Sequence, residues 1–101
     1  MTKQETIKQI DAYVSDYLGA PSHLFGLSHR TRADLKMLLL VFAEVSRLAL
    51  AANALAEANG VTVEPQTWLA YELAADRPAW ADEALKLRYQ ANCLYLGVRY
   101  S

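Results

Sequence analysis

Apolar residues recur at spacings of three and four along most of the chain, which is the pattern of amphipathic helices. The first such segment covers about residues 3–18. Thr2 and Glu5 have the spacing of a capping box at its start, and Gly19 supplies a left-handed stop at its end. Its single apolar stripe consists of Ile7, Ile10, Val14, Tyr17 and Leu18. The pattern predicts a one-sided helix over residues 3–18.

A long central helix is predicted over about residues 31–58, with Thr31 as its cap and Asn59-Gly60 as its stop. Its main apolar face consists of Met37, Leu38, Val41, Phe42, Val45, Leu48, Ala49, Ala52, Leu55 and Ala56. The residues that fall outside this face, among polar positions, are Leu39, Leu40 and Leu50. Three large apolar residues outside the main face indicate a second contact surface on this helix.

Two further helices are predicted after an extended connector at residues 61–63. Pro65 suits the first position of a short helix that ends near residue 75. The last helix runs from about residue 78 to residue 96, with Asp76 or Arg77 preceding Pro78 at its head. It has a first apolar stripe of Trp80, Ala84, Leu87, Ala91, Leu94 and Val98, and a second of Leu85, Tyr89, Cys93 and Leu96. Two stripes predict a helix packed between two neighbours, with Cys93 as a small buried hydrophobe.

These elements predict an all-α fold: a compact bundle of three to four helices with one long central helix at about residues 31–58. A length of 101 residues suits a single helical domain over residues 1–101. The chain is 53% hydrophobic and rich in alanine, which favours helix over strand and excludes the composition of a disordered chain.

Charge and cysteine content limit the partners and the compartment. The formal net charge is −1, so no strong overall field attracts nucleic acid or an anionic membrane. The single cysteine cannot form an intrachain disulfide, which suits a reducing compartment. The longest apolar run, residues 37–43, is about a third of a membrane span. We therefore expect a cytoplasmic protein without nucleic-acid or membrane partners.

One loop combines histidine with arginine near the start of the long helix: His23, His29, Arg30 and Arg32. Backbone N–H groups at a helix start favour anions, so this loop is a weak candidate anion site. An exposed polar loop explains the same residues more simply. No third ligand stands at metal-binding spacing, and we predict neither a metal nor a cofactor.

No catalytic residue is predicted. The acidic residues Asp82 and Glu83 suit the first turn of a helix for electrostatic reasons alone. Cys93 has no neighbouring base, and no phosphate-binding glycine loop occurs. Residues 67–90 have a helix-turn-helix outline, but Asp82 and Glu83 would face DNA phosphates. An enzyme and a DNA-binding regulator therefore rank behind binding functions.

A candidate partner or ligand surface combines apolar and aromatic residues with one predicted ion pair: Leu40, Glu44, Arg47, Leu50, Trp68, Trp80, Tyr89 and Tyr95. Glu44 and Arg47, three positions apart, suit a solvated surface pair, or a buried anchor if a second layer covers them. The leading hypothesis is a self-associating protein–protein interaction module, with a dimer favoured and another protein as a further partner. The alternative is a small-molecule binding protein or sensor, whose apolar pocket would contain Phe42, Trp68 and Trp80.

Overall fold

The computed structural model describes residues 1–20 and 26–100. Its elements are α1 (Lys3–Leu18), a single 3₁₀ turn (Leu27–His29), α2 (Arg32–Ala58), α3 (Pro65–Leu73) and α4 (Ala79–Arg99). Within these described ranges there is no β-strand. The predicted all-α fold with one long central helix is confirmed.

The ends of α1 follow from local sequence chemistry. The Thr2 hydroxyl accepts a hydrogen bond from the Glu5 N–H, and the Glu5 carboxylate accepts one from the Thr2 N–H, each at 3.1 Å. Gly19 ends the helix with φ of 73°. The predicted capping box and left-handed stop are both confirmed, as are the bounds of this helix.

The ends of α2 also have the predicted caps. The Thr31 hydroxyl accepts a hydrogen bond from the Asp34 N–H at 3.1 Å. At the other end Gly60 has φ of 76°, and its N–H donates to the Glu57 carbonyl. The Val61 N–H donates to the Ala56 carbonyl, which completes a Schellman motif.

The ends of α3 and α4 differ from the prediction. Helix α3 stops at Leu73 instead of residue 75, and α4 begins at Ala79 and continues to Arg99 instead of residue 96. Pro78, predicted as the first residue of α4, is its N-cap residue. Arg77 links the two helices, because its guanidinium donates to the Tyr71 carbonyl at 3.0 Å and pairs with Asp82 at 2.6 Å.

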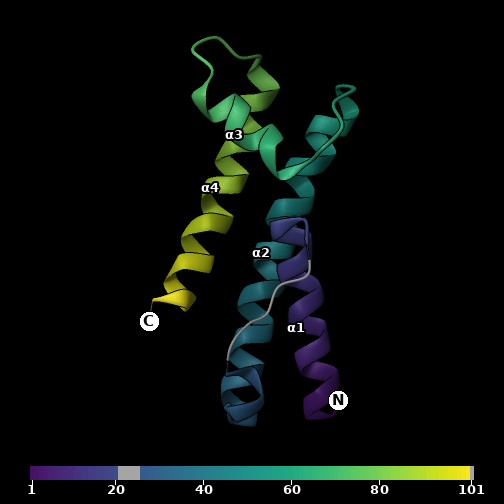
Figure 1. Cartoon of the computed structure of the whole chain (residues 1–101), viewed down its shortest axis with the longest axis vertical. Helices are drawn as coiled ribbons and strands as arrows, with labels where there is room; N and C mark the ends of the chain where they lie inside the picture. Colours follow the sequence, from purple (N-terminus) through teal and green to yellow (C-terminus); the bar gives the residue numbers. More distant parts are fainter. Residues whose placement is uncertain (21–25, 101) are drawn as a thin grey trace.

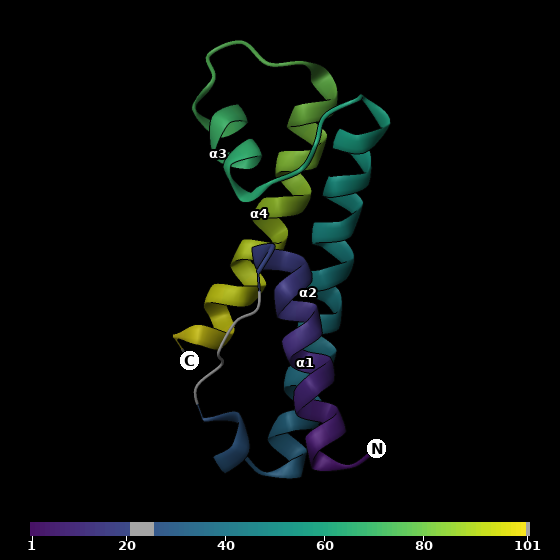
Figure 2. The same ribbon diagram turned by 45° about the vertical axis from the view of Figure 1, so that its right-hand side comes forward.

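Helix α2 is the centre of the arrangement. Figures 1 and 2 show α1 alongside the N-terminal half of α2, and α4 on another side of α2 with the short α3 beside its first turns. The C-terminal end of α4 lies away from α2 in both views. Helix α2 is long and apolar enough to cross a membrane, but the core helix of a soluble protein meets the same criterion. Residues of α1 and α4 pack against α2 in the first core cluster.

The core consists of two clusters. The first contains residues from α1, the 3₁₀ turn, most of α2 and the second half of α4: Ile10, Val14, Tyr17, Leu27, Leu35, Leu38, Phe42, Val45, Leu48, Ala49 and Ala91. The second unites the end of α2 with α3 and the first half of α4: Ala52, Ala56, Trp68, Ala84 and Leu85. Small alanine side chains dominate the second cluster, which lets the helices approach one another closely.

Three residues show that the buried side of α2 is rotated from the predicted one. Met37, assigned to the main apolar face, is 64% exposed. Leu35 is buried instead, as is Ser46, whose hydroxyl donates to the Asp16 carboxylate of α1 at 2.6 Å. The prediction was wrong here because α1 covers the side of α2 that carries Leu35 and Ser46.

The molecule is elongated, with dimensions of 46 × 24 × 18 Å and a radius of gyration of 14.7 Å. A compact domain of this length has a radius of gyration of about 13 Å. Its accessible surface is 6588 Å², whereas about 5700 Å² is typical of a compact monomer of 11.3 kDa. The chain therefore exposes more surface than a compact fold of its size requires.

Candidate functional site

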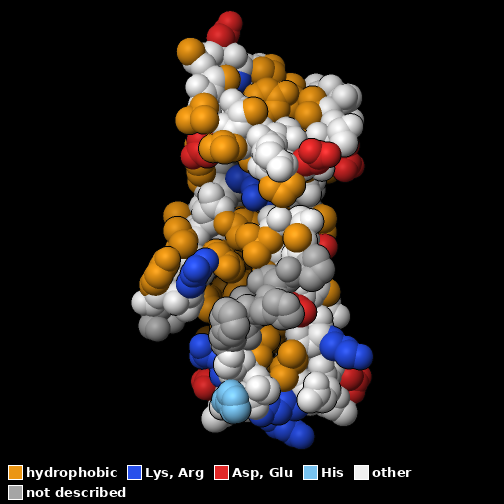
Figure 3. Space-filling view, viewed as in Figure 1, with side chains coloured by type: hydrophobic (Ala, Val, Ile, Leu, Met, Phe, Trp, Pro, Cys, Tyr) orange, Lys and Arg blue, Asp and Glu red, His pale blue; other side chains and the backbone are white. Residues whose placement is uncertain are grey.

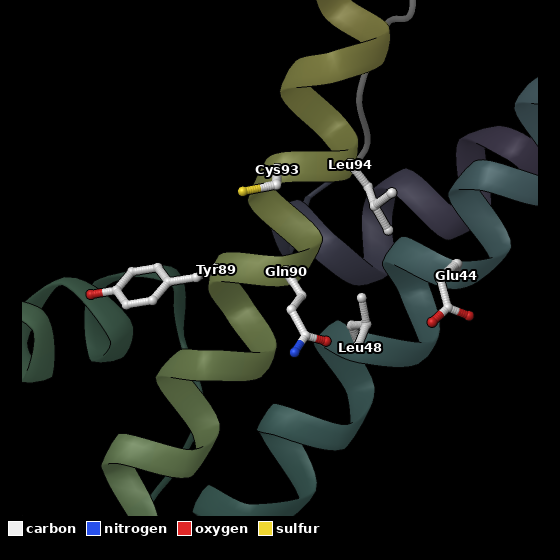
Figure 4. A pocket seen from close by; sticks show the side chains of 6 residues that line it. All are labelled: Glu44, Leu48, Tyr89, Gln90, Cys93 and Leu94. Atoms are coloured by element: carbon white, nitrogen blue, oxygen red, sulfur yellow. The ribbon is translucent and has the colours of Figure 1, made fainter.

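An open groove of about 440 Å³ lies between α2 and α4. It is lined by Glu44, Leu48, Tyr89, Gln90, Cys93 and Leu94. Figure 4 shows Leu94 and Gln90 pointing from α4 toward α2, with Leu48 below them, whereas Cys93 and Tyr89 point away along the outer side of α4. Because Leu48 is almost fully buried, it forms the floor of the groove.

Glu44 and Arg47 form the charged edge of this groove. The Arg47 guanidinium donates two hydrogen bonds to the Glu44 carboxylate, one of them from Nε at 2.9 Å. These bonds hold the pKa of Glu44 below its ordinary value and raise the pKa of Arg47. Both side chains are solvent-accessible, so the pair is the predicted surface pair of the isolated chain.

The surroundings of the groove carry little other charge. In residues 37–56 of α2 the charged side chains are Glu44 and Arg47, and residues 89–98 of α4 contain none. Leu40, one turn before Glu44, is 69% exposed. We call the groove-lining residues together with Leu40 and Arg47 the α2–α4 face. Figure 3, which views the molecule from one side, shows hydrophobic side chains along the C-terminal half of α4.

The structure brings only part of the predicted surface together. Glu44 and Tyr89 line the groove, Arg47 pairs with Glu44, and Leu40 lies one turn before Glu44 on α2. Trp68 is a core residue, only 6% exposed. The predicted residues that lie outside the groove lining are Leu40, Arg47, Leu50, Trp68, Trp80 and Tyr95.

The three aromatic residues of the alternative ligand pocket do not share one cavity. Phe42 belongs to the first core cluster, whereas Trp68 belongs to the second and Trp80 packs against it. Trp80 stacks edge-on against Tyr71, with ring centroids 5.0 Å apart. The groove between α2 and α4 is a different space with a different lining.

The exposure of Cys93 differs from the prediction. It was expected to be buried in the second stripe of α4, but it is exposed. Helix α3 packs beside the first half of α4, so within residues 1–20 and 26–100 nothing covers this part of the stripe. Sequence reasoning also missed Gln90 and Leu94 as groove residues; the uncharged run of residues 89–98 is the signal that could have revealed them.

The candidate anion loop is only partly described. His29, Arg30 and Arg32 are exposed around the start of α2, and His23 lies outside the described residues. The carbonyl of Ser28 accepts a hydrogen bond from the Lys3 ammonium at 2.7 Å, which ties this region to α1. In the described part of the chain, no three His, Cys, Asp or Glu side chains gather as a possible metal site.

A second polar feature lies where α1, α3 and α4 meet. The Arg88 guanidinium stands over the rings of Tyr17 and Trp68, 4.8 and 5.7 Å from their centroids. It also donates to the Tyr17 carbonyl at 3.0 Å, in the last turn of α1. Burial lowers the pKa of Arg88 and raises that of the Tyr17 phenol, which donates a hydrogen bond to Asn92.

Comparison with known proteins gives no relative for this chain. No protein-family model, curated protein or solved structure matches it. The function must therefore be inferred from the surface and the groove.

Proposed function

We propose that this chain is a self-associating helical interaction module that functions as a homodimer. The observation that carries the proposal is the excess of accessible surface over that of a compact monomer, roughly 900 Å². A standard protein–protein interface removes about 800 Å² from each partner. The excess is thus of the size that one partner would cover.

The kind of surface supports the same proposal. Among the exposed large apolar side chains of the two long helices are Met37, Leu40, Leu50, Leu94 and Leu96. Apolar side chains that remain exposed on two long helices are typical of helices that pack against another chain. The exposed lining of the groove is mostly apolar, as the core of a protein–protein interface is.

The test is a measurement of mass against concentration by sedimentation equilibrium or light scattering. We expect a reversible shift from 11.3 kDa to twice that mass as the concentration rises through the micromolar range. A mass that stays at 11.3 kDa up to several hundred micromolar would overturn the proposal.

A second candidate is binding of a small apolar molecule, because the groove volume lies in the range of ligand sites, about 300–1000 Å³. Its open shape favours a protein surface over a small ligand, which is usually enclosed on most sides. A thermal-shift screen of apolar metabolites distinguishes the two: a shift that does not depend on protein concentration would favour the small ligand.

A further inference from the structure

We infer that the second copy docks on the α2–α4 face, around a two-fold axis that places the Glu44–Arg47 pair of each copy opposite that of the other. The inference rests on the proposed self-association and identifies the surface that carries it. Three observations support this choice: the area, the charge pattern and the shape of the face.

The elongated shape gives the long sides of the molecule more area than its ends. The face runs along two long helices, and the molecule is 46 Å long but only 24 and 18 Å across. Side-by-side packing of two elongated chains along this face covers a large area on each, whereas end-to-end contact covers little. The roughly 900 Å² of excess surface matches one half of a standard interface of about 1600 Å².

The charge pattern is self-complementary. A two-fold interface brings each residue of one copy opposite its counterpart region in the other, so residue i meets j and j meets i. Glu44 and Arg47 lie three positions apart on α2. Across such an axis, Glu44 of one copy faces Arg47 of the other, and Arg47 of the first faces Glu44 of the second. The uncharged residues 89–98 of α4 add no repulsion.

The shape of the face combines a projection with a recess. Leu40 is exposed on α2 one turn before Glu44, and Glu44 itself lines the groove whose floor is Leu48. Under two-fold symmetry, Leu40 of each copy enters the groove of the other beside Leu94. This arrangement buries the exposed leucine of both copies at once.

Charge reversal provides the decisive test. Glu44→Arg gives each face two positive charges, and Arg47→Glu gives it two negative charges. Each variant alone should dimerise at least about tenfold more weakly than the wild type, because like charges then face each other across the axis. An equimolar mixture of the two variants should form a heterodimer with the affinity of the wild-type dimer, because a positive face then meets a negative one.

An apolar substitution gives an independent test with a matched control. Leu40→Glu should weaken the dimer at least about tenfold, because it would bury a charge in the facing groove. Leu69→Glu is the control, since Leu69 is also exposed, at 55%, but belongs to α3 and is not one of the residues that define the face. Circular dichroism confirms that each variant keeps its helices.

The outcomes separate the two claims. A monomeric wild type refutes the proposed function. A wild-type dimer that is insensitive to Glu44→Arg, Arg47→Glu and Leu40→Glu refutes the assigned face and leaves self-association standing. Weakening in both charge variants without recovery in their mixture refutes the two-fold opposition of the ion pairs.

Discussion

At the scale of single residues, Arg88 of α4 supplies the positive charge that the last turn of α1 lacks. The last turn of α1 contains no basic residue to interact with its exposed carbonyl groups and the negative end of its dipole. Arg88, from α4, donates to the Tyr17 carbonyl and stacks on aromatic rings of both α1 and α3. One guanidinium therefore joins three helices near the boundary of the two core clusters.

We predict that Arg88→Met destabilises the fold by about 1–3 kcal/mol, because it removes a charged hydrogen bond and two cation–π contacts. Arg88→Lys should recover only part of that loss, since an ammonium group lacks the planar stacking surface. Urea unfolding of the three proteins measures the effect. Equal stability of Arg88→Met and the wild type would mean that desolvation of the cation offsets all of its contacts.

Ionisation of Tyr17 makes the stability of the fold depend on pH in the alkaline range. Burial raises the pKa of its phenol above the ordinary value of 10.0. The folded state therefore favours the protonated phenol. Its contribution to the free energy of unfolding is complete below about pH 10 and is lost as the pH rises through the higher pKa of the folded state. Tyr17→Phe should cost about 1 kcal/mol at neutral pH, through loss of the bond to Asn92, and should flatten this alkaline decline. Unfolding measured at neutral pH and above the ordinary pKa of tyrosine provides the comparison.

At the scale of elements, the sequence predicted helix ends where short-range chemistry determines them. The capping box of Thr2 and Glu5 and the stop at Asn59-Gly60 involve only neighbouring residues, and both are present. The end of α3 and the start of α4 depend on Arg77, whose guanidinium reaches the Tyr71 carbonyl. Such a contact between helices leaves no periodic trace in the sequence.

Burial was predicted less well than helicity, for a physical reason. Periodicity identifies an apolar stripe but does not show whether a neighbouring element covers it. Cys93 and Met37 were both expected in covered stripes, and both are exposed. Glu44 and Tyr89 both line the groove, but Gln90 and Leu94 line it too, and its position depends on how α4 packs against α2.

The junction between α1 and α3 depends on a glycine. Gly19 has φ of 73°, and a Cβ there would lie 3.2 Å from Pro65 Cγ. We predict that Gly19→Ala destabilises the protein by about 1–2 kcal/mol, through backbone strain and crowding.

Gly97 is the matched control for Gly19. It lies within α4, and a methyl group added to it would have open space for 4 Å around, so Gly97→Ala should stabilise the fold by about 0.5–1 kcal/mol. Thermal melting of the two variants gives opposite shifts if this reasoning is correct; a loss of stability in both would contradict it.

At the scale of the whole molecule, the single cysteine allows the proposed dimer to be detected by chemical cross-linking. Cys93 borders the groove and is exposed on the outer side of α4, and any covalent link through it joins two copies. A short bismaleimide should therefore produce a cross-linked dimer from the wild type. Glu44→Arg alone should lower the yield on denaturing gels, and its mixture with Arg47→Glu should restore it. An unchanged yield at every mixing ratio would contradict the assigned face.

The first core cluster also has a consequence for synthesis of the chain. It combines Val14 of α1 with Ala91 of α4, and Tyr95 and Val98 close its side. The bond from Tyr17 to Asn92 joins residues 75 positions apart. A nascent chain that has released α1 and α2 therefore still exposes the surface that α4 will cover, and such distant contacts form slowly. Translation must reach the last turns of α4 before this cluster can close, so the unfinished chain passes through a stage open to chaperones and to premature association.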